Sequence, residues 1–175
     1  AWLDAEDDDE WGFLLVDAEN AFNKGNRIPF LWTIRHLWPG GARFAFNCYR
    51  HWSMLVLRGE NGEIIILYSK EGVTQGDPLA MILYGIALVP LAEHIRNAVP
   101  SVLQIWYADD SAFSGKASGI KKCMEILIRM GPARGYHPEP AKSIYIGKPE
   151  HEARAKVILQ AVSYTHLTLP TILLV

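Results

Sequence analysis

Residues 102–114 read VLQIWYADDSAFS, and this stretch constrains the fold more than any other part of the 175-residue chain. Two short apolar runs, 102–107 and 111–114, flank the adjacent carboxylates Asp109 and Asp110. Short runs that are rich in aromatic and β-branched residues and are separated by turn residues are typical of a β-hairpin. The pattern therefore predicts a tight hairpin that presents both carboxylates at its tip.

A further carboxylate follows a second predicted strand near the start of the chain. Residues 11–17 read WGFLLVD, a continuous apolar run that favours a strand buried on both faces and that ends on Asp17. If this strand lies beside the hairpin in one sheet, Asp17, Asp109 and Asp110 meet at one edge. Hard divalent cations prefer carboxylate oxygens, and strands hold such ligands rigidly. The sequence therefore predicts a site for two divalent cations about 3.5–4 Å apart.

The remaining segments predict an α+β fold. Helical periodicity or composition covers residues 28–37, 79–99 and 118–130. Strand-like runs cover residues 44–57, 64–68 and 143–146, and the first two are expected to pair through the turn at 59–62. Predicted breaks are the Pro-Gly-Gly stop at 39–41 and the loops at 72–77 and 136–142. We expect an antiparallel sheet packed against helices, with Pro78 in the first turn of the second helix.

Net charge, cysteine content and the length of the apolar stretches limit the classes of protein to which this chain can belong. The formal charge is −2, with 17 Lys and Arg against 19 Asp and Glu, which is acidic for a domain that binds a polyanion along its length. Cys48 and Cys123 are too few for a disulfide framework and lack metal-ligand spacing. No apolar stretch reaches the ~20 residues that span a bilayer, and the acidic start is unlike a signal peptide. We expect an intracellular protein of the cytoplasm or nucleus without a membrane partner.

Three separated motifs resemble those of reverse transcriptases and occur in the same order. Residues 13–23, FLLVDAENAFN, resemble motif A; residues 71–79, EGVTQGDPL, resemble motif B; and residues 107–110, YADD, resemble motif C. A looser fourth match, GYHPEPAKS at 135–143, resembles motif D. The Ala-Phe-Asn ending of motif A and the Gln-Gly-Asp-Pro form of motif B are most similar to retrotransposons without long terminal repeats and to group II intron relatives. Their joint occurrence, more than any single motif, carries the resemblance.

The resemblance implies a catalytic centre. Asp17, Asp109 and Asp110 would ligate two Mg²⁺ ions, for which Mn²⁺ can substitute. The implied reaction transfers a nucleotide from a dNTP to a primer 3′-hydroxyl on an RNA or DNA template. In motif D, Lys142 would protonate the pyrophosphate leaving group.

The resemblance also implies residues that bind the substrate. Phe22, five residues after Asp17 in the sequence, would exclude the ribose 2′-hydroxyl of the incoming nucleotide. Gln75, Gly76 and Pro78 would line the template and the nucleotide, and Tyr107 would lie beside them in motif C. A core position for Phe22 is the alternative that the residue type alone favours.

The resemblance divides the chain into an acidic tail at 1–10, a palm domain at 11–147, the start of a connection to a thumb at 148–162, and an unpatterned tail, foreign to the fold, at 163–175. The resemblance implies that the fingers and thumb, which hold the triphosphate and the duplex in this family, lie largely outside these 175 residues. We therefore expect weak or no activity from the fragment alone. Its expected partners include the fingers and thumb of the full-length polyprotein.

Two alternatives stay open. A viral RNA-dependent RNA polymerase shares the palm, but its motif B has Ser-Gly followed by Thr and Asn, and its motif C has Gly-Asp-Asp. A decayed palm could persist as a nucleic-acid-binding or interaction module. The intact Asp17, Asp109 and Asp110 argue against decay of the site.

Overall fold

The computed structural model of the chain describes residues 11–74, 76–148 and 151–160. The predicted tails at 1–10 and 163–175 lie outside the described residues, as does Gln75.

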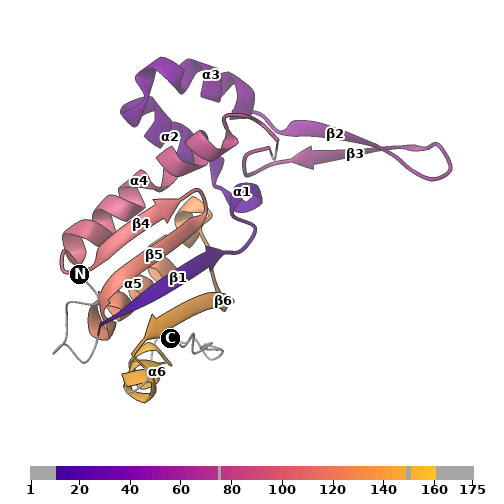
Figure 1. Ribbon diagram of the computed structural model, residues 1–175. Helices are drawn as coiled ribbons and strands as arrows, with labels where there is room; N and C mark the ends of the chain where they lie inside the picture. The colour runs from indigo at the N-terminus through magenta and orange to yellow at the C-terminus, as the bar shows by residue number, and fades with distance from the viewer. Residues whose placement is uncertain (1–10, 75, 149–150, 161–175) are drawn as a thin grey trace.

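Four strands form one antiparallel sheet in the order β4-β5-β1-β6 (Figure 1). They are β1 (Trp11–Ala18), β4 (Leu103–Tyr107), β5 (Asp110–Lys116) and β6 (Pro138–Gly147). The predicted hairpin is confirmed, because β4 and β5 pair with Tyr107 opposite Asp110. The register also aligns Val16 with Ser111, which brings the end of β1 beside the start of β5.

Two long helices cover one face of this sheet. They are α4 (Ala80–Ala98), predicted from helical composition, and α5 (Ala117–Met130), predicted from periodicity. Leu14, Val16 and Phe113 point toward them and are at most 2% exposed. On the other face Leu15 is 39% exposed, so the prediction that β1 is buried on both faces is wrong. A continuous apolar run does not by itself reveal whether a second layer exists.

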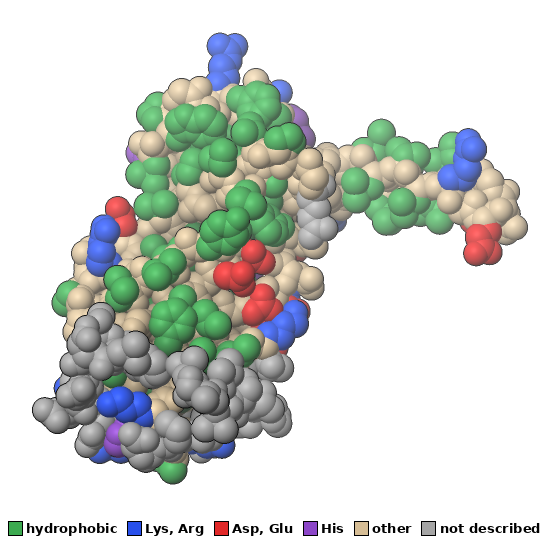
Figure 2. Space-filling view, viewed as in Figure 1, with side chains coloured by type: hydrophobic (Ala, Val, Ile, Leu, Met, Phe, Trp, Pro, Cys, Tyr) green, Lys and Arg blue, Asp and Glu red, His purple; other side chains and the backbone are tan. Residues whose placement is uncertain are grey.

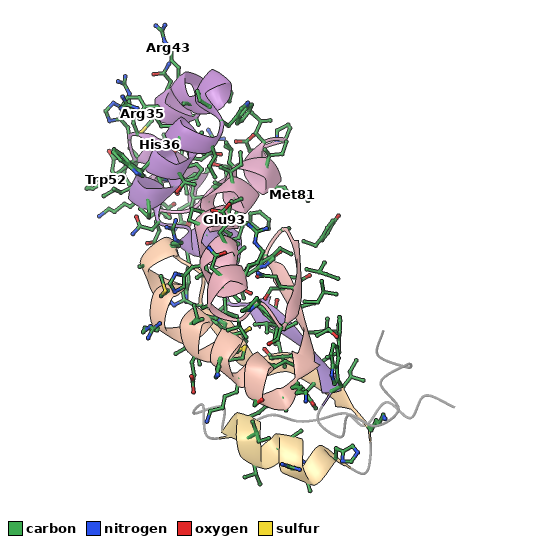
Figure 3. The ribbon with its side chains drawn as sticks, turned by 90° about the vertical axis from the view of Figure 1, so that its left-hand side faces the viewer. Arg35, His36, Arg43, Trp52, Met81 and Glu93 are labelled. Atoms are coloured by element: carbon green, nitrogen blue, oxygen red, sulfur yellow. The ribbon has the colours of Figure 1, made fainter. Side chains whose placement is uncertain are left out.

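Helices α1 (Ala21–Lys24), α2 (Arg27–Leu37) and α3 (Pro39–Tyr49) follow β1. The predicted strand at 44–57 is wrong in its first half, where α3 buries Ala45 and Tyr49 on one face. Pro39 explains the break and the restart: it keeps Trp38 out of the helical region, and its ring fits the first turn of a helix. Figure 3 shows Arg35, His36 and Arg43 on the outer side of this pair, where all three side chains are exposed.

The predicted hairpin of β2 (Ser53–Arg58) and β3 (Ile64–Ser69) is confirmed. It projects from the rest of the molecule as a separate two-stranded sheet (Figure 1). Val56 and Ile66, which pair across the strands, are 58% and 50% exposed. Apolar side chains are exposed on both of its faces, so little besides its own hydrogen bonds stabilises the outer part of the hairpin.

The end of the described chain differs from prediction in one element. Strand β6 begins at Pro138, inside the predicted loop, because it pairs with β1 as far as Ala18 across an irregularity in register. The short helix η1 (Pro132–Arg134) precedes β6, and α6 (Glu152–Gln160) follows it and packs against α5. None of the described helices has both the length and the apolar character that a membrane crossing needs.

Candidate active site

The sheet brings the three predicted carboxylates to one edge. Asp17 lies one residue before the end of β1, and Asp110 is the first residue of the neighbouring strand β5. Asp109 and Ala108 form the turn between β4 and β5. Ala108 has a φ of 54°, in the left-handed region that two-residue hairpin turns use. A tight turn and an antiparallel register thus place all three residues.

A hollow of about 420 Å³ opens on the uncovered face of the sheet at this edge. Its polar wall contains Asp17, Asp110, Ser111 and Lys142, and Tyr107 lies on its rim as a 70% exposed side chain. Its apolar lining comes from the strands: Leu15, Val16, Ile105, Ala112 and Ile144. Figure 2 shows acidic side chains gathered at this place, with a basic side chain beside them and hydrophobic side chains around them.

The carboxylates of Asp17, Asp109 and Asp110 lie close enough together for their negative charges to influence one another. Partial burial and then the charges of Asp109 and Asp17 raise the pKa of Asp110 above its ordinary value. The ammonium group of Lys142 neutralises part of this negative charge, because its Nζ lies 3.3 Å from Oδ2 of Asp17. The lysine comes from β6, so motif D lies beside motif A in space. Asp109 does not line the hollow, although its charge acts on Asp110 from the turn.

Two buried tyrosines lie beneath the turn. The hydroxyl of Tyr136 is 2.9 Å from Oγ of Ser111, the residue that follows Asp110, and both side chains are at most 2% exposed. The hydroxyl of Tyr84, in α4, is also buried but has no hydrogen-bond partner among the described residues. Burial raises the pKa of both phenols, and nearby carboxylates add to the effect. Trp106 is half-buried, with its ring centroid 5.7 Å from that of Tyr136.

Phe22 occupies a position between the core and the surface. Its ring lies 5.2 Å from that of Tyr84 at an angle of 44°, and the side chain is half-buried. Its carbonyl accepts a hydrogen bond of 2.7 Å from the amide of Val73. Gly72 has a φ of +73°, and a Cβ there would lie 2.3 Å from the same carbonyl. Only glycine therefore allows motif B to run this close to motif A.

The motif B loop leads into α4 through Asp77. Its Oδ1 accepts from the amide of Leu79 at 2.9 Å, and its Oδ2 accepts from the hydroxyl of Tyr49. Pro78 lies in the turn before α4, which begins at Ala80 rather than at Leu79, so Pro78 is just outside the first turn of the helix. Gly76 is exposed, with a φ of +89°, a conformation that favours glycine.

Arg27 is a site residue that sequence reasoning missed. Its guanidinium is buried and donates to the carbonyls of Gly72 at 2.9 Å, His51 at 3.0 Å, Ser69 at 3.1 Å and Glu71 at 3.2 Å, and to Oγ of Ser69 at 3.1 Å. It therefore ties α2 to the base of the β2–β3 hairpin and to motif B. No local pattern signals this role, because every partner is a distant neutral oxygen.

Comparisons with known proteins show that this chain resembles solved structures in its fold, whereas its sequence matches no family profile and no curated protein. Among solved structures, apo telomerase from Candida tropicalis, truncated from its C-terminal domain, matches 79% of this chain with 15% identity and a TM-score of 0.64. Telomerase from Candida albicans in complex with a TWJ fragment of telomeric RNA matches 80% with 11% identity and a TM-score of 0.61.

The chain spans 31% and 28% of the lengths of these two telomerases. At such low identity the match is evidence for the fold alone. The antiparallel sheet packed against helices is consistent with a polymerase palm-like fold, as predicted.

Proposed function

We propose that this chain is the catalytic palm of an RNA-directed DNA polymerase, from a retrotransposon without long terminal repeats or a group II intron relative. One observation carries the proposal: Asp17 and Asp110 line one hollow at the edge of a palm-like sheet, with Asp109 in the adjoining turn. The order of motifs A to D along the chain supports it independently.

The proposed reaction is nucleotidyl transfer. The primer 3′-oxygen forms a bond to the α-phosphorus of a dNTP and loses its proton, while the bond to pyrophosphate breaks. Lys142, at the wall of the hollow, is placed to give a proton to the departing pyrophosphate. This role requires its ammonium to leave Asp17, with which it forms an exposed ion pair of low stability.

The three proposed ligands, Asp17 and Asp110 in the hollow and Asp109 in the adjoining turn, fit Mg²⁺ in their chemistry. All three proposed ligands are carboxylates, the donors that hard divalent cations prefer, and Asp17 already attracts the ammonium of Lys142. Bound Mg²⁺ supplies activation of the primer hydroxyl and charge neutralisation of the triphosphate. Within the described residues, no three His, Cys, Asp or Glu side chains are grouped so that they could hold a metal ion. Metal binding would therefore require the three carboxylates to come closer together than they lie in this structure.

The proposed partners are a primer on an RNA or DNA template, dNTPs, and fingers and thumb domains of a longer polyprotein. The solved Candida albicans telomerase is in complex with a fragment of telomeric RNA, which supports an RNA partner here. Phe22, beside motif B, is proposed to contact the sugar of the incoming nucleotide, and Gly76 and Tyr107 to contact the nucleotide or template.

Metal titration with a matched control tests the proposal. Thermal unfolding of the 175-residue chain is measured with rising Mg²⁺ or Mn²⁺ for the wild type, Asp17→Asn, Asp109→Asn and Glu125→Gln. Glu125 is an exposed acid on α5 that pairs with Lys121, so its loss removes one charge far from the hollow. At a metal concentration ten times the Kd, linkage predicts about 1.4 kcal/mol of stabilisation. Both Asp variants should lose most of this response, and Glu125→Gln should keep it.

Primer extension then separates catalysis from binding. We expect weak metal-dependent extension with dNTPs on RNA and DNA templates, and none in Asp109→Asn. An unchanged metal response in both Asp variants would place the cations elsewhere and contradict the proposal. Nucleic-acid binding without a metal response or extension would favour the interaction module instead.

A further inference from the structure

A second pocket, of about 390 Å³, lies beyond the end of β1 and shares no lining residue with the hollow. It lies where α1, the start of α2, the end of the β2–β3 hairpin and the segment around η1 converge. Its lining consists of Lys24, Asn26, Arg27, Ile28, Lys70, Glu71, Pro132 and His137. Lys24, Arg27 and Lys70 thus oppose a single carboxylate, that of Glu71.

Among the described residues, no carboxylate forms an ion pair with Arg27, whose guanidinium carbon lies 5.5 Å from the centroid of the Tyr49 ring. The side chain is 7% exposed, and every hydrogen bond described for its guanidinium goes to a neutral carbonyl or hydroxyl oxygen. Buried charges in proteins are normally paired with an opposite charge. Burial lowers the pKa of Arg27, and the nearby charge of Glu71 acts against this shift. The wall of the pocket is therefore positively charged.

The two lysines are placed to supply mobile donors. Lys70 is exposed, and its Nζ lies 4.4 Å from the centroid of the Trp52 ring, a contact that leaves its N–H donors usable. Nζ of Lys24 lies 2.8 Å from Oε2 of Glu19, at the surface. Such an exposed pair is worth little, so an anion with more charge can compete for the lysine. The ring of His137 adds a further nitrogen to the wall.

We propose that this pocket binds a phosphate group, either a phosphodiester of a nucleic-acid strand or a free pyrophosphate. Phosphate matches the pocket because it offers several acceptor oxygens and a negative charge to two lysines and to the charged wall behind them. The inference does not depend on polymerase activity, since none of the carboxylates of the hollow lines this pocket, whose one acidic residue is Glu71.

Binding of inorganic pyrophosphate to the 175-residue chain tests the proposal by titration calorimetry at low salt. EDTA is present throughout, so that no metal bridges the probe to the carboxylates of the hollow. Lys70→Gln should lower the affinity roughly tenfold, the effect of one charge-assisted hydrogen bond. Glu71→Gln should raise the affinity several-fold, because it removes the one carboxylate of the lining. If Lys70 and Glu71 served only the stability of the fold, the two substitutions would not change the affinity for pyrophosphate in opposite directions.

Lys24→Gln and Lys121→Gln form a matched pair. Both lysine side chains are 32% exposed and both pair with a glutamate, but only Lys24 lines the pocket. Lys24→Gln should lose at least tenfold in affinity, because it also leaves Glu19 unpaired, and Lys121→Gln should match the wild type within twofold. Equal affinities in the wild type, Lys70→Gln and Lys24→Gln, or no binding by the wild type, would overturn the proposal.

Competition identifies the source of the phosphate. If a single-stranded oligonucleotide displaces pyrophosphate from the wild type, and binds Lys70→Gln more weakly, the pocket holds a nucleic-acid strand. If pyrophosphate binding depends on Lys70 while the oligonucleotide does not compete, the pocket holds free pyrophosphate. If the metal titration shows no metal site in the hollow, the proposed function is contradicted, but either of these binding results can still be obtained.

Discussion

Replacing each of the two buried tyrosines beneath the carboxylate-bearing turn with phenylalanine should have opposite effects on stability. Tyr136 and Tyr84 are 0% and 1% exposed, but only Tyr136 has a described hydrogen bond, to Ser111 at 2.9 Å. Tyr136→Phe leaves the 2% exposed Ser111 hydroxyl without its partner, at a cost of about 1–3 kcal/mol. Tyr84→Phe removes a buried hydroxyl that has no described partner, so it should be neutral or slightly stabilising.

Thermal and urea unfolding measure these differences. For a chain of this size, each kcal/mol corresponds to about 2–4 °C in Tm. Ser111→Ala should cost a similar amount to Tyr136→Phe, and the double variant should cost less than the sum, because it leaves neither hydroxyl unpaired. Equal destabilisation by Tyr84→Phe and Tyr136→Phe, or strict additivity in the double variant, would refute the assignment of this hydrogen bond.

Three further predictions concern other parts of the molecule. With the chain joined to fingers and thumb, Phe22→Val should raise the kcat/KM for ribonucleotides relative to deoxyribonucleotides; a lowered Tm with unchanged sugar preference would assign the ring to the core. Burial raises the pKa of Cys123 to about 12, so an aromatic disulfide at pH 8 should label exposed Cys48 quickly and Cys123 only on unfolding. Because this pKa is raised, the buried thiol should stabilise the fold fully at neutral pH and lose that contribution above about pH 9. Amides of the projecting β2–β3 hairpin should exchange hydrogen faster than those of β1, and equal protection would show that the hairpin is covered in solution.

The elements that carry the carboxylates were predictable because they depend on short-range patterns. The hairpin that carries Asp109 and Asp110 consists of two neighbouring runs and a turn, and Asp17 lies one residue before the end of the apolar strand β1. That β1 lies beside this hairpin depends on pairing between segments that are distant in the sequence. Helices α2, α4 and α5 likewise follow from local periodicity, even though Pro90 lies inside α4. The catalytic roles of Asp17, Asp109 and Asp110 come from the resemblance between motifs and remain proposals.

Other features depend on contacts between distant segments, which no local pattern encodes. The open face of the sheet exists because α4 and α5 cover only one side, and β6 begins early because β1 offers it a partner. Likewise, Arg27 acquires its role only when the hairpin base and motif B converge on it. Local sequence thus determined which residues carry the proposed chemistry. The tertiary structure decided which side of the sheet stays accessible and where a second, positively charged pocket forms, because both depend on how segments that are distant in the sequence pack together.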